Sequence, residues 1–376
     1  MKTKILFGGD FAPIKGFEKI ARDKKELIFN DALEVIKGAD LAFVNLECPL
    51  TFSNQPIKKS GPNIKSIPQA IECLKSFSLV GLANNHCLDF GAEGLKDTIE
   101  ACKTQSLSYV GAGFGDEKNK PYYWRGKQLT IAIIAIAEKE FNSENNIGAC
   151  LINQRLNLEA INEAKSKADY VIITLHGGNE YFSLPRPKLR ELCKYFIDLG
   201  VNSVICHHPH VAGGYELYKN SPIVYSLGNL IFDKLVDSED WNYGYFFQIN
   251  LDKNTLSSFE LIPYRQSVEL EGVELLKGGE KECFLSKINN LRDILENRET
   301  EWISLWHQFL KSKKNMYISK MFIPFTFFGI NRLQNIFPFL NKLLFGKNKL
   351  KKINIIRCES HLEALETILN QKHHDS

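Results

Sequence analysis

Apolar runs alternate with helical stretches up to about residue 265, and this alternation most restricts the possible folds. The expected strands are 4–9, 41–46, 78–83, 107–113, 129–137, 170–176, 201–207, 222–228 and 243–251. The expected helices include 26–38, 92–105, 155–168 and 187–199. Continuous apolar strands separated by helices predict an α/β protein with a buried sheet. The later strands follow one another with little helix between them, which favours a mixed sheet, or two sheets face to face, over one parallel sheet.

The composition is that of a globular protein. The 376 residues are 44% hydrophobic and 24% charged, which is enough for a large core and one to three domains. The formal net charge of +3 is too mild to indicate a nucleic-acid partner. The nine cysteines are scattered and include no CxxC pair. Neither a disulfide framework nor a structural zinc module is therefore expected.

The first residues do not have the pattern of an export signal. The apolar run in MKTKILFGGDFAP is far shorter than the roughly 7–15 residues that a signal peptide needs. No uninterrupted apolar stretch reaches the ~18 residues of a membrane-spanning helix. We therefore expect a cytoplasmic protein.

The character of the chain changes after about residue 270. Residues 302–352 contain no Asp or Glu, while Lys and Arg recur among aromatic and aliphatic residues, and Pro324 and Pro338 interrupt any helix. We divide the chain into a domain over 1–268 and a basic, aromatic-rich extension over 269–376. One interpretation of 300–352 is peripheral contact with an anionic membrane at its inner face. The other is a helical subdomain that packs on the main domain, or an oligomer contact.

Side chains typical of metal sites follow five of the expected strands. Carboxyl ends of strands in an open α/β sheet converge on one crevice, so side chains placed there come together. We expect one site containing Asp10, Asn45, Glu47, Asn84, Asn85, His86, Asp89, His176, Glu180, His207, His208 and His210.

This mixed nitrogen and oxygen set suits Mn, Fe or Zn better than Ca²⁺ or Mg²⁺ alone. The ligands exceed the needs of one four-coordinate ion, which indicates two divalent metal ions sharing a carboxylate. Each residue alone has a structural alternative: Asp10 also suits a helix cap, the Asn-Asn-His stretch a polar turn, and His176 a buried hydrogen-bonded position. The coincidence at five strand ends favours the metal site.

Five motifs occur in the order and spacing of a known family. They are GGD at 8–10, VNLECPLT at 44–51, LANNHCLDFG at 82–91, LHGGNEY at 175–181 and HHPHVAGGYELYKNSPIVYSLGNLIFD at 207–233. On these motifs the chain resembles the CapA family (also called PgsA-like), named for poly-γ-glutamate capsule synthesis and similar to calcineurin-like metallophosphoesterases. The resemblance implies a layered α-β-β-α sandwich of two mixed sheets, followed here by a mostly helical C-terminal extension.

The resemblance also implies roles for single residues. The implied metal ligands are Asp10, Glu47 (in the bridging position), Asn85, His176, His208 and His210. His86 would be the uncoordinated histidine that meets the substrate or leaving group, and His207 a neighbour of the ligands. The sequence departs from the pattern twice. Ala12 replaces a superfamily histidine, which weakens one metal or leaves it to another residue, and Gly177 replaces a family tryptophan, which opens the pocket or removes a stacking surface.

These observations predict a metal-dependent hydrolase of phosphoesterase type, acting through a metal-bound hydroxide in the biosynthesis of an anionic surface polymer. His86 and Asp89 are the predicted catalytic residues; Asp89 either fixes the His86 tautomer or caps the following helix. Glu180 either orients His176 or pairs with Arg186. The predicted substrate-binding residues are Asn45, Asn84, Glu180, Tyr225 and Asn229. The substrate would be an anionic polymer or a phosphorylated molecule. The alternative is a non-catalytic scaffold for synthesis or export of an anionic polymer at the membrane.

Overall fold

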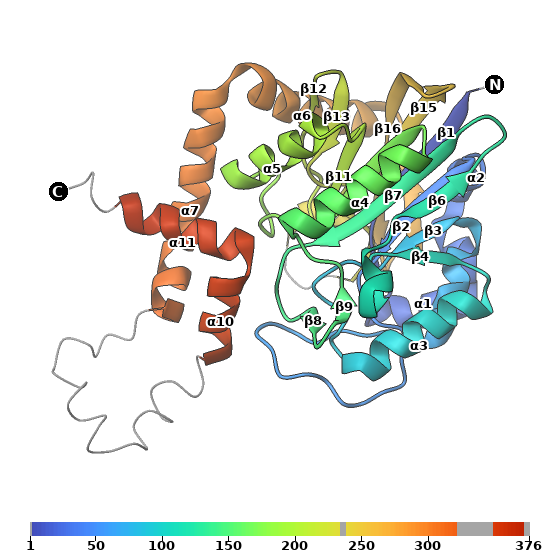
Figure 1. The fold of residues 1–376 in the computed structure, drawn as a ribbon, viewed down its shortest axis with the longest axis horizontal. Coiled ribbons are helices and arrows are strands. Elements are labelled where there is room, and N and C mark those ends of the chain that lie inside the picture. The colour runs from blue at the N-terminus through green and yellow to red at the C-terminus, as the bar shows by residue number, and fades with distance from the viewer. Residues whose placement is uncertain (1, 234–237, 322–348, 372–376) are drawn as a thin grey trace.

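Two mixed β-sheets packed face to face form the centre of the molecule (Figure 1). The structure is a computed structural model that describes residues 2–233, 238–321 and 349–371. The first sheet contains, in spatial order, β17 (Gly272–Leu275), β16 (Thr255–Ser267), β15 (Tyr243–Asp252), β1 (Thr3–Ala12), β2 (Leu41–Leu46), β3 (Leu79–Gly81) and β4 (Ser108–Val110), and β14 (Asn229–Phe232) also pairs with β1.

The second sheet packs against the first. Its spatial order is β12 (Tyr215–Tyr218), β13 (Ser221–Val224), β11 (Ser203–His207), β10 (Tyr170–His176), β7 (Thr130–Ala137) and β6 (Tyr122–Arg125). A small third sheet contains β5 (Ala112–Phe114), β9 (Ile147–Ala149) and β8 (Ser143–Glu144).

Helices cover the outer faces of both sheets. The α-helices are α1 (Gly16–Lys24), α2 (Leu33–Lys37), α3 (Gly91–Thr104), α4 (Gln154–Lys167), α5 (Pro187–Asp198), α6 (Gly278–Asn297), α7 (Glu299–Met321), α10 (Lys349–Arg357) and α11 (Glu359–Gln371). The 3₁₀ segments are η1 (Lys25–Ala32), η2 (Pro68–Ser76), η3 (Gly115–Asn119) and η4 (Glu239–Asn242).

The alternation of side chains along β7 shows why the fold is layered. Ile131 and Ile133 belong to the core that the two sheets share, whereas Ile134 and Ile136 belong to the core beneath α4 and α5. Successive side chains of a strand point to opposite faces, so an uninterrupted apolar strand must be covered on both sides. The expected fold class, an α-β-β-α sandwich of two mixed sheets with a helical C-terminal part, is confirmed.

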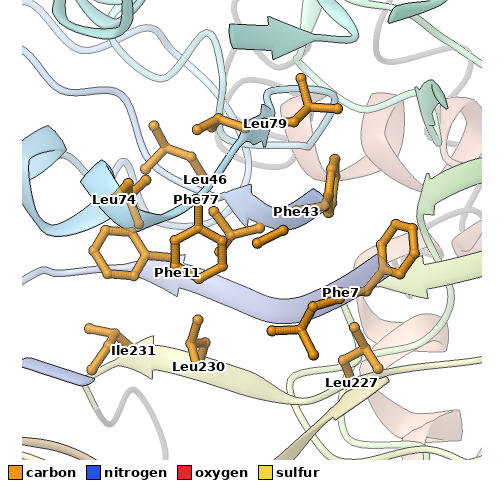
Figure 2. Packing of buried hydrophobic residues seen from close by; sticks show 14 of the residues in the cluster. Phe7, Phe11, Phe43, Leu46, Leu74, Phe77, Leu79, Leu227, Leu230 and Ile231 are labelled. Atoms are coloured by element: carbon orange, nitrogen blue, oxygen red, sulfur yellow. The ribbon is translucent and has the colours of Figure 1, made fainter. Parts of the chain in front are cut away.

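Aromatic side chains fix β1 between its neighbours (Figure 2). The rings of Phe7 and Phe43 lie 5.5 Å apart between centroids, and Phe7 and Phe11 are fully buried. Burial of one such ring stabilises the fold by about 1.5–3 kcal/mol. Gly9 allows β14 to approach, because a Cβ there would lie 2.0 Å from the carbonyl oxygen of Gly228. The end of β1 is therefore held firmly.

Parallel pairing brings the polar strand ends to one place. In the first sheet β1, β2 and β3 run parallel, and in the second sheet β7, β10 and β11 do. The two sheets meet where His207 Nε2 lies 3.1 Å from the carbonyl oxygen of Gly8. The carboxyl ends of both sets of strands thus open on the same crevice.

Several boundaries differ from the expected ones. The expected strand 107–113 is divided between β4 in the first sheet and β5 in the small sheet, and the expected strand 222–228 ends at Val224. The helix expected at 26–38 is a 3₁₀ segment followed by the short helix α2, because Asn30 (φ 43°) breaks the regular backbone. Beside the site, β14 pairs with β1 at Asn229 and Asp10.

The C-terminal helices form a core of their own. Trp306, Leu310 and Tyr317 of α7 pack against Ile355 and other apolar residues of α10 and α11. Figure 1 shows these helices together at one end of the molecule, on the side of α5. No helix in the described part of the chain is both long and apolar enough to cross a membrane.

The described part of the 300–352 segment therefore buries apolar residues among helices. Pro324, Pro338 and the rest of 322–348 lie outside the described residues, so contact with a membrane remains a prediction. The division at residue 268 also remains a prediction, and β17 continues the first sheet beyond it, to Leu275.

Candidate metal centre

Asp10 lies at the centre of the crevice and is fully buried. Its Oδ1 accepts a hydrogen bond from Nδ2 of Asn45 (2.7 Å), and its Oδ2 accepts one from the backbone N–H of His208 (3.2 Å). These donors come from β2 and from the loop after β11, so Asp10 joins the two sheets. Its orientation is set before any ion binds.

Glu47 is the carboxylate shared by two groups of possible ligands. One group contains Glu47, His176 and His208, and the other contains Asp10, Glu47 and His210. Nε2 of His176 and Nε2 of His210 each lie 3.5 Å from Oε1 of Glu47. Both oxygens of Glu47 are buried, and neither accepts a hydrogen bond from the described residues. Such a buried carboxylate is costly unless a cation lies beside it.

The His-Pro-His turn after β11 places one imidazole in each of the two ligand groups. His208 (φ 102°) and His210 (φ 60°) both have left-handed backbone conformations, which cost about 1–3 kcal/mol each for such residues. Nδ1 of His208 lies 3.1 Å from Nε2 of His176. Nδ1 of His210 lies 3.0 Å from Oδ1 of Asn229. Both ligand positions of this turn therefore carry backbone strain.

Asn85 lies beside the group of Glu47, His176 and His208. Its Oδ1 lies 3.0 Å from Nε2 of His176, the last residue of β10. Nδ1 of the same imidazole lies 3.2 Å from Nδ2 of Asn45. All six predicted metal ligands therefore lie in this crevice. His207, in contrast, is directed to the backbone of Gly8 and is a neighbour of the ligands.

The pKa directions agree with a site for divalent cations. Burial and the neighbouring histidines lower the pKa of His176 well below its usual value, and burial lowers the pKa of His208 to about 4. The imidazoles are thus neutral, as metal ligands must be. Burial and the adjacent Asp10 raise the pKa of Glu47 well above its usual range. A cation between these carboxylates would offset that repulsion.

A second polar group stands beside the ligands. Nδ1 of His86 lies 2.7 Å from Oδ2 of Asp89, whose Oδ1 pairs with the ammonium group of Lys59. Burial and the nearby Lys59 lower the pKa of His86. The helix after Asp89 begins with Phe90 as its N-cap. Asp89 thus contacts the imidazole, as one of its two predicted roles requires, and does not cap α3.

Comparison with known proteins places the chain in a family. The family model described as bacterial capsule synthesis protein PGA_cap matches residues 4–234. The chain belongs to this family. It is 31% identical over 270 residues to the PGA biosynthesis protein CapA of Bacillus subtilis (strain 168), covering 68% of this chain and 70% of that protein. It is 34% identical over 236 residues to the capsule biosynthesis protein CapA of Bacillus anthracis, covering 58% of this chain and 56% of that protein.

Solved structures with a similar arrangement are more distant. One is a novel phosphatase of Mycoplasma pneumoniae, with 13% identity, a TM-score of 0.46, and 70% of this chain and 93% of that chain covered. Another is a putative 5'-nucleotidase from Staphylococcus aureus in complex with alpha-ketoglutarate, with 14% identity, a TM-score of 0.46, and 77% of this chain and 58% of that chain covered. The fold class given above rests on the strand order of this PGA_cap chain itself.

The pocket in front of the ligands has walls from outside the family-matched segment. Its volume is about 440 Å³. Asn85, His86, His208 and His210 form its floor. The C-terminal helices contribute Phe309, Lys313, Met316, Tyr317, Lys351, Asn354, Ile355 and His361. The extension therefore closes one side of the candidate active site.

A buried ion-pair network fixes that extension in place. The guanidinium of Arg186 pairs with Glu138 (2.7 Å) after β7 and with Glu363 of α11. Glu138 also accepts hydrogen bonds from the backbone N–H of Gly178 (3.0 Å) and of Ser360 (3.1 Å). One carboxylate thus touches both the loop after His176 and the start of α11.

Two departures from the family pattern have a structural context. Ala12 is buried and pairs with Phe232 of β14, and both ligand groups form without a side chain from this position. At Gly177 the space beside the backbone is occupied, and whether the missing tryptophan opens the pocket or removes a stacking surface stays a prediction. The space that a side chain would need is filled by Glu138, because a Cβ there would lie 2.6 Å from Cγ of Glu138.

Gly177→Ala should therefore destabilise the fold by about 1–3 kcal/mol, since Glu138 is held by Arg186 and cannot move aside freely. Equilibrium unfolding in urea measures this difference. Gly279→Ala on α6 is the matched control, because nothing lies within 4 Å of its added Cβ. Equal midpoints for the two variants would contradict the argument.

Three predicted substrate-binding residues support ligands instead. Asn45, Asn84 and Asn229 are buried, and the pocket lining does not include them. Asn45 orients Asp10, and Asn229 orients His210. Asn84 donates to the backbone carbonyl of Leu46 (2.7 Å) and so fixes the chain between two strand ends. These buried hydrogen bonds account for the three asparagines, so no contact with a substrate is needed to explain them.

The other two predicted substrate-binding residues differ from each other. Tyr225 belongs to the core beneath α5, and its hydroxyl donates to Glu216 (2.5 Å), so the prediction that it lines the pocket is wrong. Neighbouring residues of an extended chain point to opposite faces, and Tyr225 faces away from the crevice. Glu180 does line the pocket. Its proposed partner Arg186 pairs with Glu138 and Glu363.

Lys59 and the C-terminal wall were not anticipated from the sequence. Lys59 comes from the long loop between β2 and η2, where "IKKSGPN" has no pattern that separates it from Lys58. Yet only 4% of its side chain is exposed. The wall residues lie more than 70 residues beyond the last family motif, so spacing within a motif carries no information about them.

Proposed function

We propose that this chain is a metal-dependent hydrolase of phosphoesterase type. The observation that carries the proposal is the shared position of Glu47, which lies in two ligand groups at the floor of one pocket. A shared carboxylate is how proteins hold two ions close enough to act on one phosphoryl centre. The family relationship supports a role in capsule biosynthesis.

The residues that would hold the ions follow from the two groups. Asp10, Glu47 and His210 would hold one, and Glu47, His176 and His208 would hold the other, with Asn85 beside them. When bound, such ions supply Lewis acidity and lower the pKa of coordinated water. The nitrogen and oxygen donors fit Mn, Fe or Zn.

His86 would handle the proton at the leaving oxygen. Asp89 contacts Nδ1 of His86. Nε2 would then exchange a proton with a substrate in the pocket that His86 lines. Lys59 helps to lower the pKa of His86, and this makes the protonated ring a stronger acid. Asp89 keeps the ring in one orientation, so Asp89 is a positioning residue.

The pocket charges favour an anionic substrate. Lys59, Lys313 and Lys351 line it together with Glu140 and Glu180. The ammonium group of Lys313 lies 5.6 Å from the ring centroid of Tyr181, which places it over the pocket wall. Two ions at the floor would add further positive charge. We therefore infer an anionic polymer or a phosphorylated molecule as the substrate.

The test is hydrolysis of p-nitrophenyl phosphate and bis(p-nitrophenyl) phosphate by protein loaded with Mn²⁺ or Zn²⁺. His86→Asn should lower kcat by about 10²–10⁴-fold, because general acid catalysis contributes that much. His307→Asn, which changes an exposed histidine of α7, is the control and should retain activity. If the loaded wild type hydrolyses neither ester, and no other phosphoester, the protein is better described as a binding module for an anionic polymer.

A further inference from the structure

A second group of ligand-type side chains lies at the pocket wall, apart from the centre at its floor. It consists of Glu140, Cys358 and His361, whose ligand atoms all lie within 4.8 Å of one another. Glu140 follows β7, Cys358 lies between α10 and α11, and His361 is in the first turn of α11. We propose that these three side chains bind a further divalent ion of the zinc type.

The donor set is selective. A thiolate, an imidazole and a carboxylate together are typical ligands of zinc, and three protein ligands leave the fourth position of a tetrahedral ion open. With Zn–S of ≈ 2.3 Å and Zn–O of about 2.0–2.2 Å, a tetrahedral ion would separate sulfur and oxygen by about 3.6 Å. Sγ of Cys358 lies 4.0 Å from Oε1 of Glu140. Small side-chain movements would therefore bring the two ligands into range.

Neighbouring side chains hold these ligands as metal sites require. The hydroxyl group of Tyr317 lies 2.8 Å from Nδ1 of His361, and this contact assigns the ion to Nε2. Nδ2 of Asn354 donates to Oε2 of Glu140 (3.5 Å). Asn354 is 7% exposed, and its Oδ1 accepts no hydrogen bond from the described residues. Such outer contacts orient the ligands of natural metal sites.

The electrostatic surroundings also favour a cation. Burial raises the pKa of Glu140 to about 7. Burial and the nearby carboxylates of Glu138 and Glu140 raise the pKa of the Cys358 thiol well above its usual value. An ion here would offset the repulsion among these acids and would lower both pKa values. It would also join α11 to the segment after β7, because His361 belongs to α11 and Glu140 follows β7.

The competing account is a neutral thiol that only makes hydrogen bonds. Sγ of Cys358 lies 3.1 Å from Oγ of Ser360 and 3.5 Å from Oε2 of Glu138. A spectroscopic test separates the two accounts, because a thiolate bound to Co²⁺ gives an intense charge-transfer band in the near ultraviolet. The floor centre contains no thiolate, so this readout is independent of the proposed hydrolysis.

The experiment uses the full chain titrated with Co²⁺. Wild type should show the band, and Cys358→Ser should lack it and bind about one ion fewer per chain by mass spectrometry. Cys283→Ser, which changes an exposed cysteine of α6, should retain the band. Asp10→Asn should also retain it while losing metal from the floor.

His361→Asn is a second variant, which keeps the thiol in place if Cys358→Ser fails to fold. It should weaken Co²⁺ binding at the wall by at least about tenfold, as loss of even an indirect contact to a metal commonly does. A wild type without the band, or a band that persists in Cys358→Ser, would overturn the proposal.

Discussion

Glu47→Gln should abolish tight binding of divalent ions at the pocket floor and lower any hydrolysis by roughly 10³-fold or more, about 4 kcal/mol in the barrier. The reason is that Glu47 belongs to both ligand groups, so one substitution weakens both ions. Metal content by mass spectrometry and hydrolysis under saturating Mn²⁺ are the measurements. Glu144→Gln, an exposed change in β8, is the control.

The same substitution should have the opposite effect on the metal-free protein. Glutamine removes a buried charge beside Asp10, so metal-free Glu47→Gln should unfold at a higher temperature than metal-free wild type. Adding Mn²⁺ should then stabilise wild type more than the variant, because the variant lacks the shared ligand of the pocket floor. A variant that binds as many ions as wild type would contradict the shared-carboxylate arrangement.

The difference in stability between metal-free wild type and metal-free Glu47→Gln should depend on pH with a defined sign. Burial raises the folded pKa of Glu47 well above its unfolded value near 4.5. A group with a raised pKa contributes stability at pH below the unfolded value, and that contribution is lost as the pH rises through the folded pKa. The advantage of metal-free Glu47→Gln over wild type should therefore be largest at high pH and shrink on acidification.

Arg186→Met should destabilise the protein by about 3–5 kcal/mol, because it leaves Glu138 and Glu363 buried without their partner. Both carboxylates contact the guanidinium, and the side chains of the three residues are at most 5% exposed. Equilibrium unfolding in urea measures the loss. The docking of α11 depends on this pair, so pocket binding should weaken together with stability.

Lys188→Met is the matched control for the Arg186 variant. Its ion pair with Glu366 (2.6 Å) has side chains that are 59% and 48% exposed. Exposed pairs contribute at most about 1 kcal/mol. Similar unfolding midpoints for the two variants would contradict a docking role for Arg186.

Acid should affect wild type and Arg186→Met differently. Burial acts to raise the pKa of Glu138, but the charge and hydrogen bonds of Arg186 outweigh it and lower the pKa below its usual value. The stability from this depressed pKa is present above about pH 4.5 and is lost as the pH falls through the folded pKa. In Arg186→Met that contribution is missing. The difference in free energy of unfolding between wild type and Arg186→Met should therefore become smaller in acid.

The ligands could be predicted from the sequence because the fold uses strand direction to assemble them. His176, His208 and Glu47 are far apart in the chain, yet each follows a buried strand that runs toward the same crevice. An apolar run that ends in an imidazole or carboxylate therefore indicates both the strand and its functional end.

The same rule cannot say which way a polar side chain points. Asn45 lies near the end of β2 and Asn229 begins β14, but their side chains orient Asp10 and His210 and do not line the pocket. Tyr225 faces the opposite core. These directions depend on the pairing of whole sheets, which no short motif encodes.

The pocket wall was beyond prediction for a related reason. Arg186 and Glu363 are separated by 177 positions, and nothing in either local sequence indicates the other. The docking of α11 involves this buried ion pair, the hydrogen bond from Ser360 to Glu138 and the hydrophobic core of the C-terminal helices. Tertiary pairing of this kind leaves no period in the sequence.

The position of Glu138 has a consequence for communication across the molecule. Its carboxylate holds the amide of Gly178, next to the His176 strand end, and the amide of Ser360 at the start of α11. Binding equilibria that share such a hinge are reciprocal. A molecule that binds the C-terminal helices and shifts Glu138 would change the affinity of the pocket for its ligand. The ligand would in turn change the affinity of the C-terminal helices for that molecule by the same factor.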